Sequence, residues 1–402
     1  MKRKDIAFIL MILIVSIYFF SIYNLTPDIM VSKDGTGLYE KAGPSNSIIE
    51  EESIENKIVT GTILAAGDIM FHMPQVKAAY DPVTKTYDFR DNFKYVKKHI
   101  ESANLSIANF ETVTGGNEIG FSGFPNFNSP EETLLAIKDA GFQVLTTANN
   151  HCLDQGKKGL INTIYAIEKQ GMKNIGTYRE SSTPILIEEI NEIKLALLSY
   201  TYGFNGMEYT ITEEEQGYMV NKIDENKIKK DIQNVKALGA DMVVIFIHWG
   251  NEYEKEPSEE QIELGRNMVK WGANIIFGSH PHVIQKTETI NYNGKDNFII
   301  YSMGNFLSNQ RKEIMNNKHT EDGIMVKVEF EKDFSKDETI IKNIKYIPTW
   351  VRKYKDNNRL KYEIIPIEDF LENESLQVQL RKGEMVRIEE SFHETMDKVV
   401  QH

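Results

Sequence analysis

Residues that can bind a metal ion recur in this sequence directly after short apolar runs. The runs end in aspartate, glutamate, asparagine or histidine, which together form a set of oxygen and imidazole ligands. Such a set suits Mn, Fe, Zn, Mg or a similar divalent ion. Two ions about 4 Å apart, bridged by a carboxylate such as Asp68, can hold a phosphoryl oxygen and generate hydroxide at neutral pH. The candidate ligands are Asp68, Glu111, Asn150, His248, His280 and His282.

Three histidines add detail to this prediction. The His-Pro-His motif contains His280 and His282, and in an extended segment both imidazoles would point to one face. His151 directly follows Asn150, so its ring points elsewhere. It can serve as the general acid for a leaving group, oriented by Asp154.

Four of the six ligand candidates also have a plain structural interpretation. Asp68 can belong to a turn or an N-cap, and Glu111 can be a surface or capping carboxylate. Asn149 and Asn150 can supply turn chemistry, because Asn tolerates left-handed backbone conformations. His248 can be a hydrogen-bonded core residue. Because five such clusters follow apolar runs, we favour a shared site.

The apolar runs predict the strands that must position these side chains. Short runs rich in Ile, Val and Leu are typical of strands buried on both faces. Helical patterns that end at a glycine lie between several of them, which indicates an α/β sheet architecture. In such sheets, ligand sites gather beyond the carboxyl ends of the strands. The predicted strands are 63–66, 105–108, 142–145, 242–247, 275–277 and 298–301, and the predicted helices are 129–140 (with Ser129 as N-cap), 221–238 and 257–271.

Composition limits the possible functions. The 402 residues carry 46 Lys and Arg against 59 Asp and Glu, which gives a formal charge of −13. Since no basic excess exists to neutralise phosphates, general nucleic-acid binding is excluded. The single cysteine, Cys152, can form neither an intrachain disulfide nor a cysteine-rich zinc site. Any metal must therefore be held by His, Asp, Glu and Asn.

The N-terminus predicts a membrane anchor. Three basic residues at 2–4 precede an uncharged run at 6–23, which as a helix would be about 27 Å long, close to the thickness of a bilayer core. The basic residues favour a cytoplasmic N-terminus and an extracytoplasmic main domain. A cleaved signal peptide is the alternative, although no small-x-small site follows the run. We expect a single-pass anchor at 1–24 and an extracytoplasmic tether at 25–57.

The main domain is expected at 58–312, and residues 313–402 are expected to complete or cover it. The segment 323–330 alternates like a strand that is half-exposed to water. The other expected elements are strands at 340–348 and 360–366 and helices at 368–377 and 384–400.

Six motifs follow one another along the chain from Thr62 to Leu307. They are Gly67-Asp68-Ile69-Met70, Asn109-Phe110-Glu111, Asn149-Asn150-His151 with Asp154, Gly156 and Gly159-Leu160, His248-Trp249-Gly250 with Glu252-Tyr253, Gly278-Ser279-His280-Pro281-His282, and Tyr301-Ser302-Met303-Gly304-Asn305-Phe306. Taken together, these motifs resemble those of the CapA (PgsA) family of bacterial poly-γ-glutamate capsule synthesis. The resemblance implies the fold of calcineurin-like metallophosphatases, an αββα sandwich of two mixed sheets flanked by helices.

The resemblance implies that the six candidate ligands bind metal and that His151 is the catalytic acid. Two positions depart from the metallophosphatase pattern. That pattern has Asp-x-His, whereas His72 lies four residues after Asp68. Glu111 stands where the pattern usually has aspartate, which would lengthen a metal bridge by one methylene. The further motif residues that can contribute are His72, Asn149, Trp249, Glu252 and Asn305.

The resemblance also implies a biological role at the cell membrane. Such a protein would act with the membrane-bound poly-γ-glutamate synthase complex in making, exporting or anchoring the polymer. The alternatives are a secreted metal-dependent hydrolase of phosphoesters or a cell-wall polymer, and a non-catalytic polymer-binding or scaffold protein. Because the chain is acidic, positive charge for a polyanion must come from metal or from local basic residues such as Lys157, Lys158 or Arg311.

Overall fold

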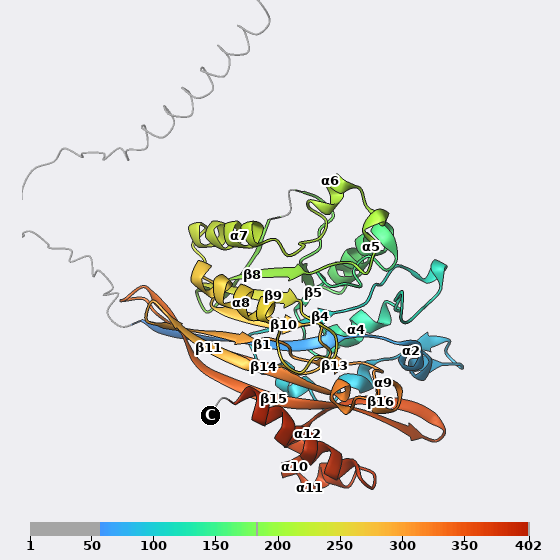
Figure 1. Cartoon of the computed structure of the whole chain (residues 1–402). Coiled ribbons are helices and arrows are strands. Elements are labelled where there is room, and N and C mark those ends of the chain that lie inside the picture. Colours follow the sequence, from blue (N-terminus) through green and yellow to red (C-terminus); the bar gives the residue numbers. More distant parts are fainter. Residues whose placement is uncertain (1–56, 182–183, 401–402) are drawn as a thin grey trace, which may run out of the picture. The chain divides into compact units, whose positions relative to one another are not determined.

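The computed structural model describes residues 57–181 and 184–400, which form two β-sheets with helices on their outer faces (Figure 1). The expected anchor at 1–24, and the tether as far as residue 56, lie outside the described residues. Within the described ranges, no helix is both long and apolar enough to span a bilayer.

The first sheet is mixed and contains eight strands. Its order is β16-β15-β14-β1-β4-β5-β6, and β13 pairs with the end of β1. Strands β1, β4, β5 and β6 are parallel, so their carboxyl ends meet at one edge. The bounds are β1 Ile58–Ile69, β4 Leu105–Phe110, β5 Val144–Thr146, β6 Lys173–Ile175, β13 Asn305–Leu307, β14 Asp322–Asp333, β15 Glu338–Asp356 and β16 Arg359–Pro366.

The second sheet is also mixed and has the order β11-β12-β10-β9-β8-β7. Its four inner strands are parallel, and its two edge strands are antiparallel to their neighbours. The bounds are β7 Leu186–Ile190, β8 Ile193–Thr201, β9 Met242–His248, β10 Ile275–Ser279, β11 Thr287–Tyr292 and β12 Lys295–Ile300, and a separate small hairpin consists of β2 Tyr80–Asp81 and β3 Thr86–Tyr87.

The two sheets pack face to face with helices outside them. On β1, Ile63 and Ala65 face the second sheet, whereas Leu64 and Ala66 face α4 and α5, as the alternation of a strand requires. Helices α7 and α8 cover the second sheet (Figure 1). This arrangement confirms the expected sandwich of two mixed sheets flanked by helices. The helix bounds are α2 Met73–Ala79, α3 Lys97–Ile100, α4 Glu132–Asp139, α5 Gly156–Lys169, α6 Glu213–Gln216, α7 Glu225–Ala237, α8 Glu259–Trp271, α9 Lys312–Met315, α10 Ile367–Glu372, α11 Glu374–Gln377 and α12 Glu384–Val399.

The C-terminal strands extend the first sheet from its centre. Strand β14 pairs with β1, and its residues Ile324, Val326 and Val328 are buried between the sheets. Met325 faces the opposite core. The expectation of a half-exposed strand at 323–330 is therefore wrong for 323–326, which are buried, but it holds from Lys327 to Phe330, where the partly exposed Lys327 and Glu329 alternate with the buried Val328 and Phe330. Helices α10 and α12 pack against β15 and β16 (Figure 1).

All six predicted strands are present, but three predicted helix boundaries are wrong. Ser129 does not cap α4, because its hydroxyl pairs with that of Thr112 at 2.8 Å. Helix α7 begins after Asp224, whose carboxylate caps it. The helix predicted at 368–377 is divided at Asn373, whose side chain caps α11. In each case a short polar side chain bonds to a partner other than the one the local pattern suggests.

At Gly67, β1 lies directly against the backbone of the segment that precedes β13. A Cβ at this position would lie 2.0 Å from the carbonyl oxygen of Gly304, which accepts a hydrogen bond from the Asp68 amide at 3.0 Å. We expect Gly67→Ala to lower the free energy of unfolding by more than about 3 kcal/mol, because backbone must move. Gly203→Ala is the matched control, since nothing lies within 4 Å of a Cβ there. Urea denaturation measures the free energy of unfolding of both variants. Equal values would contradict the close packing of Gly67 against Gly304.

Candidate metal centre

The carboxyl ends of strands from both sheets meet at one place. Asp68 lies at the end of β1, Glu111 directly follows β4, and His248 is the last residue of β9. The loops after β5 and β10 supply the other predicted ligands, Asn150, His280 and His282. All six side chains are buried, with at most 3% of their surface exposed. The structure therefore brings the six candidates together.

Glu111 is shared by two groups of potential ligands. Donor atoms of Asp68, Glu111 and His248 lie within 4.8 Å of one another, and so do donor atoms of Glu111, His280 and His282. A carboxylate between two ligand groups is the arrangement that a two-ion centre requires. Glu111 is therefore a candidate bridging residue in addition to Asp68, because Glu111 belongs to both groups and Asp68 Oδ2 also lies 3.1 Å from His282 Nδ1.

Hydrogen bonds fix the carboxylate of Asp68. Its Oδ1 accepts a hydrogen bond from Asn109 Nδ2 at 2.8 Å, and its Oδ2 lies 3.1 Å from His282 Nδ1. Asn109 is held in turn by Thr146 at 3.1 Å and Asn149 at 3.2 Å, which donate to its Oδ1. Asn109 is thus a site residue missing from the predicted set, although it opens the motif that contains Glu111.

The imidazole of His248 is held on both sides. Its Nδ1 lies 2.9 Å from the hydroxyl of Ser279, and its Nε2 lies 3.0 Å from Asn150 Oδ1 and 3.4 Å from Glu111 Oε1. Tyr202 stacks on this ring with centroids 6.3 Å apart. Sequence reasoning missed Tyr202, because a tyrosine after an apolar run does not suggest a ligand.

Burial dominates the charge states of these side chains. Burial and the neighbouring Asp68 carboxylate raise the pKa of Glu111 well above its ordinary value. Burial lowers the pKa of His248 to about 3 and that of His280 to about 2. Burial also disfavours the charged form of His282, but the Glu111 and Asp68 carboxylates outweigh it and raise its pKa to about 9. His248 and His280 are therefore neutral near pH 7, the form in which imidazole binds metal.

Two buried polar atoms of the cluster lack a hydrogen-bond partner, namely Glu111 Oε1 and His280 Nδ1. An unsatisfied buried polar atom costs about 1–3 kcal/mol. A cation would give such atoms a partner, and carboxylate with imidazole is a set that binds Mn, Fe, Zn or Mg. The residues present therefore fit divalent ions.

The His-Pro-His segment is not extended. His280 has a φ of +98° and His282 a φ of +58°, so both residues occupy backbone regions that non-glycine residues seldom adopt. The prediction that an extended backbone aligns the two imidazoles is therefore wrong. Backbone strain of this kind persists where the surroundings impose it, most often at functional sites.

His151 and Asp154 form a buried pair beside the ligand groups. His151 Nδ1 lies 2.8 Å from Asp154 Oδ2, which also accepts a hydrogen bond from the Phe127 amide at 2.7 Å. The other ring nitrogen of His151 is therefore the one available to a substrate. His151 and His282 line a cavity of about 210 Å³, whose rim includes the exposed side chain of Phe124.

The five further candidates have different positions. His72 and Glu252 line this cavity but belong to neither ligand group. Asn149 donates to a backbone carbonyl at the end of β4 at 2.9 Å. Trp249 donates to a backbone carbonyl just after β12 at 2.9 Å, which makes it a packing residue. Asn305 donates to a backbone carbonyl before β14 at 2.9 Å and holds β13 in place.

A third group of potential ligands lies outside the strand ends. It consists of His319, Asp322 and Glu394, and His319 is partly buried. Arg387 contacts Asp322 at 2.5 Å, and Lys318 contacts Glu394 at 2.8 Å. Because these cations already neutralise the carboxylates, the group is an ion-pair network.

Known proteins share the sequence around this site. The family model described as bacterial capsule synthesis protein PGA_cap matches residues 62–310. A capsule biosynthesis protein CapA from Bacillus anthracis is 31% identical over 264 residues, which cover 64% of this chain and 61% of that protein. A PGA biosynthesis protein CapA from Bacillus subtilis is 30% identical over 273 residues, which cover 64% of this chain and 67% of that protein.

Two solved structures are also similar. One is a phosphatase from Mycoplasma pneumoniae, with a TM-score of 0.43 and 15% identity over 73% of this chain and 94% of that one. The other is the calcineurin-like phosphoesterase YfkN from Bacillus subtilis, with a TM-score of 0.42 and 15% identity over 73% of this chain and 91% of that one.

Proposed function

Because this chain belongs to the bacterial capsule synthesis family described by the PGA_cap model, we propose that it acts in making, exporting or anchoring a poly-γ-glutamate capsule. We further propose that its buried site is a metal-dependent hydrolase centre. One observation carries the second proposal. Two ligand groups share Glu111 beside a cavity that His151 lines.

Phosphoester hydrolysis is the reaction that this arrangement supports best. Divalent ions, when bound, supply hydroxide at neutral pH and stabilise charge on phosphoryl oxygens. His151 donates a proton to the leaving oxygen through the ring nitrogen that Asp154 does not engage. Asp154 fixes the orientation of that ring, and the side chains of Met70, Phe124 and Ile314 give the cavity part of its apolar lining.

The cellular setting is part of the same proposal. The uncharged run at 6–23 would anchor the chain in the cell membrane with the domain outside, where it would meet the poly-γ-glutamate synthase complex and the polymer. Fractionation of host cells tests this point, since the protein should sediment with membranes and become accessible to protease added outside the cytoplasm. Recovery in the cytoplasmic fraction would contradict the anchor.

Substitution of the His-Pro-His motif tests whether the metal centre serves capsule formation. We expect His280→Ala/His282→Ala in the native host to abolish the capsule, because one ligand group loses two of its three members. His393→Ala is the control, since this histidine is exposed on α12. Capsule is measured as cell-associated and released polymer. A capsule that persists unchanged at normal protein levels would show that capsule formation does not use this site.

A further inference from the structure

The catalytic cavity is poorly suited to hold a polyanion. The residues that line it include Glu252 but no Lys or Arg, and the chain as a whole carries a charge of −13. The basic residues that the sequence suggests for this role are already paired, Lys157 with Glu215, Lys158 with Glu118 and Arg311 with Glu321. An acidic polymer would therefore need another part of the surface.

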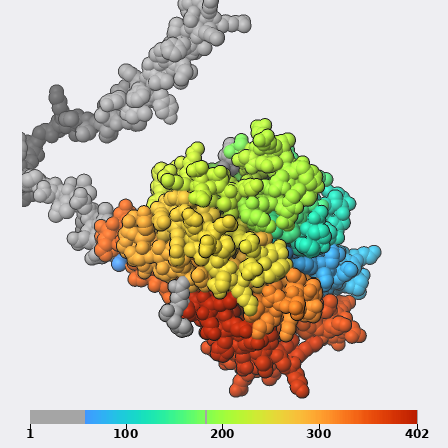
Figure 2. Space-filling view, viewed as in Figure 1, coloured from blue at the N-terminus to red at the C-terminus, as the bar shows by residue number. Residues whose placement is uncertain are grey.

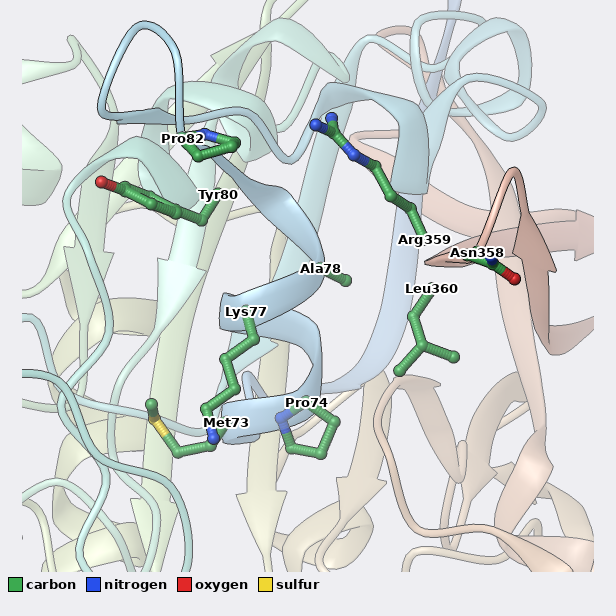
Figure 3. Close-up of a pocket in the computed structure, with 9 residues that line it drawn as sticks. All are labelled: Met73, Pro74, Lys77, Ala78, Tyr80, Pro82, Asn358, Arg359 and Leu360. Atoms are coloured by element: carbon green, nitrogen blue, oxygen red, sulfur yellow. The ribbon is translucent and has the colours of Figure 1, made fainter.

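A larger cavity of about 600 Å³ lies between α2 and the hairpin of β15 and β16 (Figure 3). Its apolar lining includes Met73, Ala78 and Leu360, and its basic lining consists of Lys77 and Arg359 (Figure 3). In the space-filling view, the blue surface near α2 adjoins the orange-red surface of this hairpin (Figure 2). We call this cavity the α2 groove.

The α2 groove is locally basic in an acidic chain. Its lining contains two basic side chains, Lys77 and Arg359, and no acidic one, a net charge of +2. Lys77 and Arg359 are exposed, and neither forms an ion pair or hydrogen bond through its side chain within the described ranges. Unpaired cations on an acidic protein attract anionic ligands selectively, because like charges elsewhere repel them.

We propose that the α2 groove binds a polycarboxylate chain, the capsule polymer itself, at a subsite separate from the metal centre. Lys77 and Arg359 would pair with carboxylates, while the apolar lining contacts the methylene groups between them. The identity of the polymer rests on the proposed capsule function. Helix α2 begins directly after His72, which lines the catalytic cavity. A stretch of bound polymer about 10 Å long, lying along α2, would therefore reach that cavity.

Binding of labelled poly-γ-glutamate to the purified full chain in detergent tests this proposal. We expect Lys77→Glu/Arg359→Glu to weaken binding at least about tenfold in fluorescence anisotropy, and added salt to weaken binding by the wild type. Lys229→Glu/Lys230→Glu makes the same charge change at exposed positions on α7 and should alter affinity less than about twofold. Lys77→Gln/Arg359→Gln should give a smaller loss, and thermal unfolding confirms that each variant is folded.

Four outcomes decide between the sites. Wild-type affinity in the folded Lys77→Glu/Arg359→Glu variant would overturn the proposal, as would equal losses in the α7 control. Glu111→Gln should bind the polymer normally, and loss of binding in that variant alone would place the polymer at the metal centre instead. The groove can bind polymer while substitution of His280 and His282 leaves the capsule intact. That result would support polymer binding in the groove and contradict the proposed role of the metal centre.

Discussion

Glu111→Gln should remove the metal ions from the protein while leaving its fold intact. Glu111 belongs to both ligand groups, so an amide at this position removes one carboxylate charge from each group at once. Substitution of residues that only orient metal ligands lowers metal affinity by about 10–100-fold. Because Glu111 is itself a candidate ligand, we expect Glu111→Gln to lower metal affinity by more than that. Metal content after loading with Mn and gel filtration measures the effect, with up to two ions in the wild type and fewer than one in the variant.

Thermal unfolding gives a second readout of the same substitution. A ligand at 100 times its dissociation constant stabilises the folded state by about 2.7 kcal/mol, so added Mn should raise the Tm of the wild type but not that of Glu111→Gln. Glu252→Gln is the matched control, because Glu252 lines the cavity without belonging to either group. Full metal content in Glu111→Gln would exclude Glu111 as the shared ligand.

His151→Asn should lower phosphoester hydrolysis by about 10²–10⁴-fold, the usual contribution of a general acid, with metal content unchanged. The loss should depend on the leaving group. An alkoxide needs a proton as it leaves, whereas p-nitrophenolate does not, so alkyl esters should suffer far more than p-nitrophenyl esters. Asp154→Asn should act in the same direction, because the His151 ring would lose its orienting carboxylate.

Comparison of kcat for the two ester classes separates catalysis from structure. If His151 is a general acid, its substitution should lower kcat strongly for the alkyl ester and only slightly for the p-nitrophenyl ester. Equal losses for both would mean that His151 supports the site structurally, and unchanged rates for both would remove it from the reaction.

The composition of the site could be predicted from sequence because its residues follow buried strands. Parallel strands bring their carboxyl ends to one edge, so Asp68 and Glu111 had to lie near each other once the strands were recognised, whereas His248 ends a strand of the second sheet. The sharing of Glu111 depends on distances between two sheets, which spacing along the chain does not encode. The backbone at His280 and His282 was wrongly predicted, because loop conformation there is imposed by tertiary contacts.

Other features escaped prediction for identifiable reasons. Strand β8 lies inside the second sheet, but it ends in Ser199, Tyr200 and Thr201, so a search guided by metal ligands passes over it. Tyr202 was missed with it. The groove beside Lys77 joins two segments about 280 residues apart, and no local pattern indicates that they meet.

The central claim is that two ions share Glu111, and anomalous diffraction from Mn-loaded crystals tests it most directly. We predict two peaks about 3.5–4 Å apart on either side of the Glu111 carboxylate. One should lie beside Asp68 and His248, and the other beside His280 and His282. No peak in this cluster, or Mn found only beside His319, Asp322 and Glu394, would contradict the account.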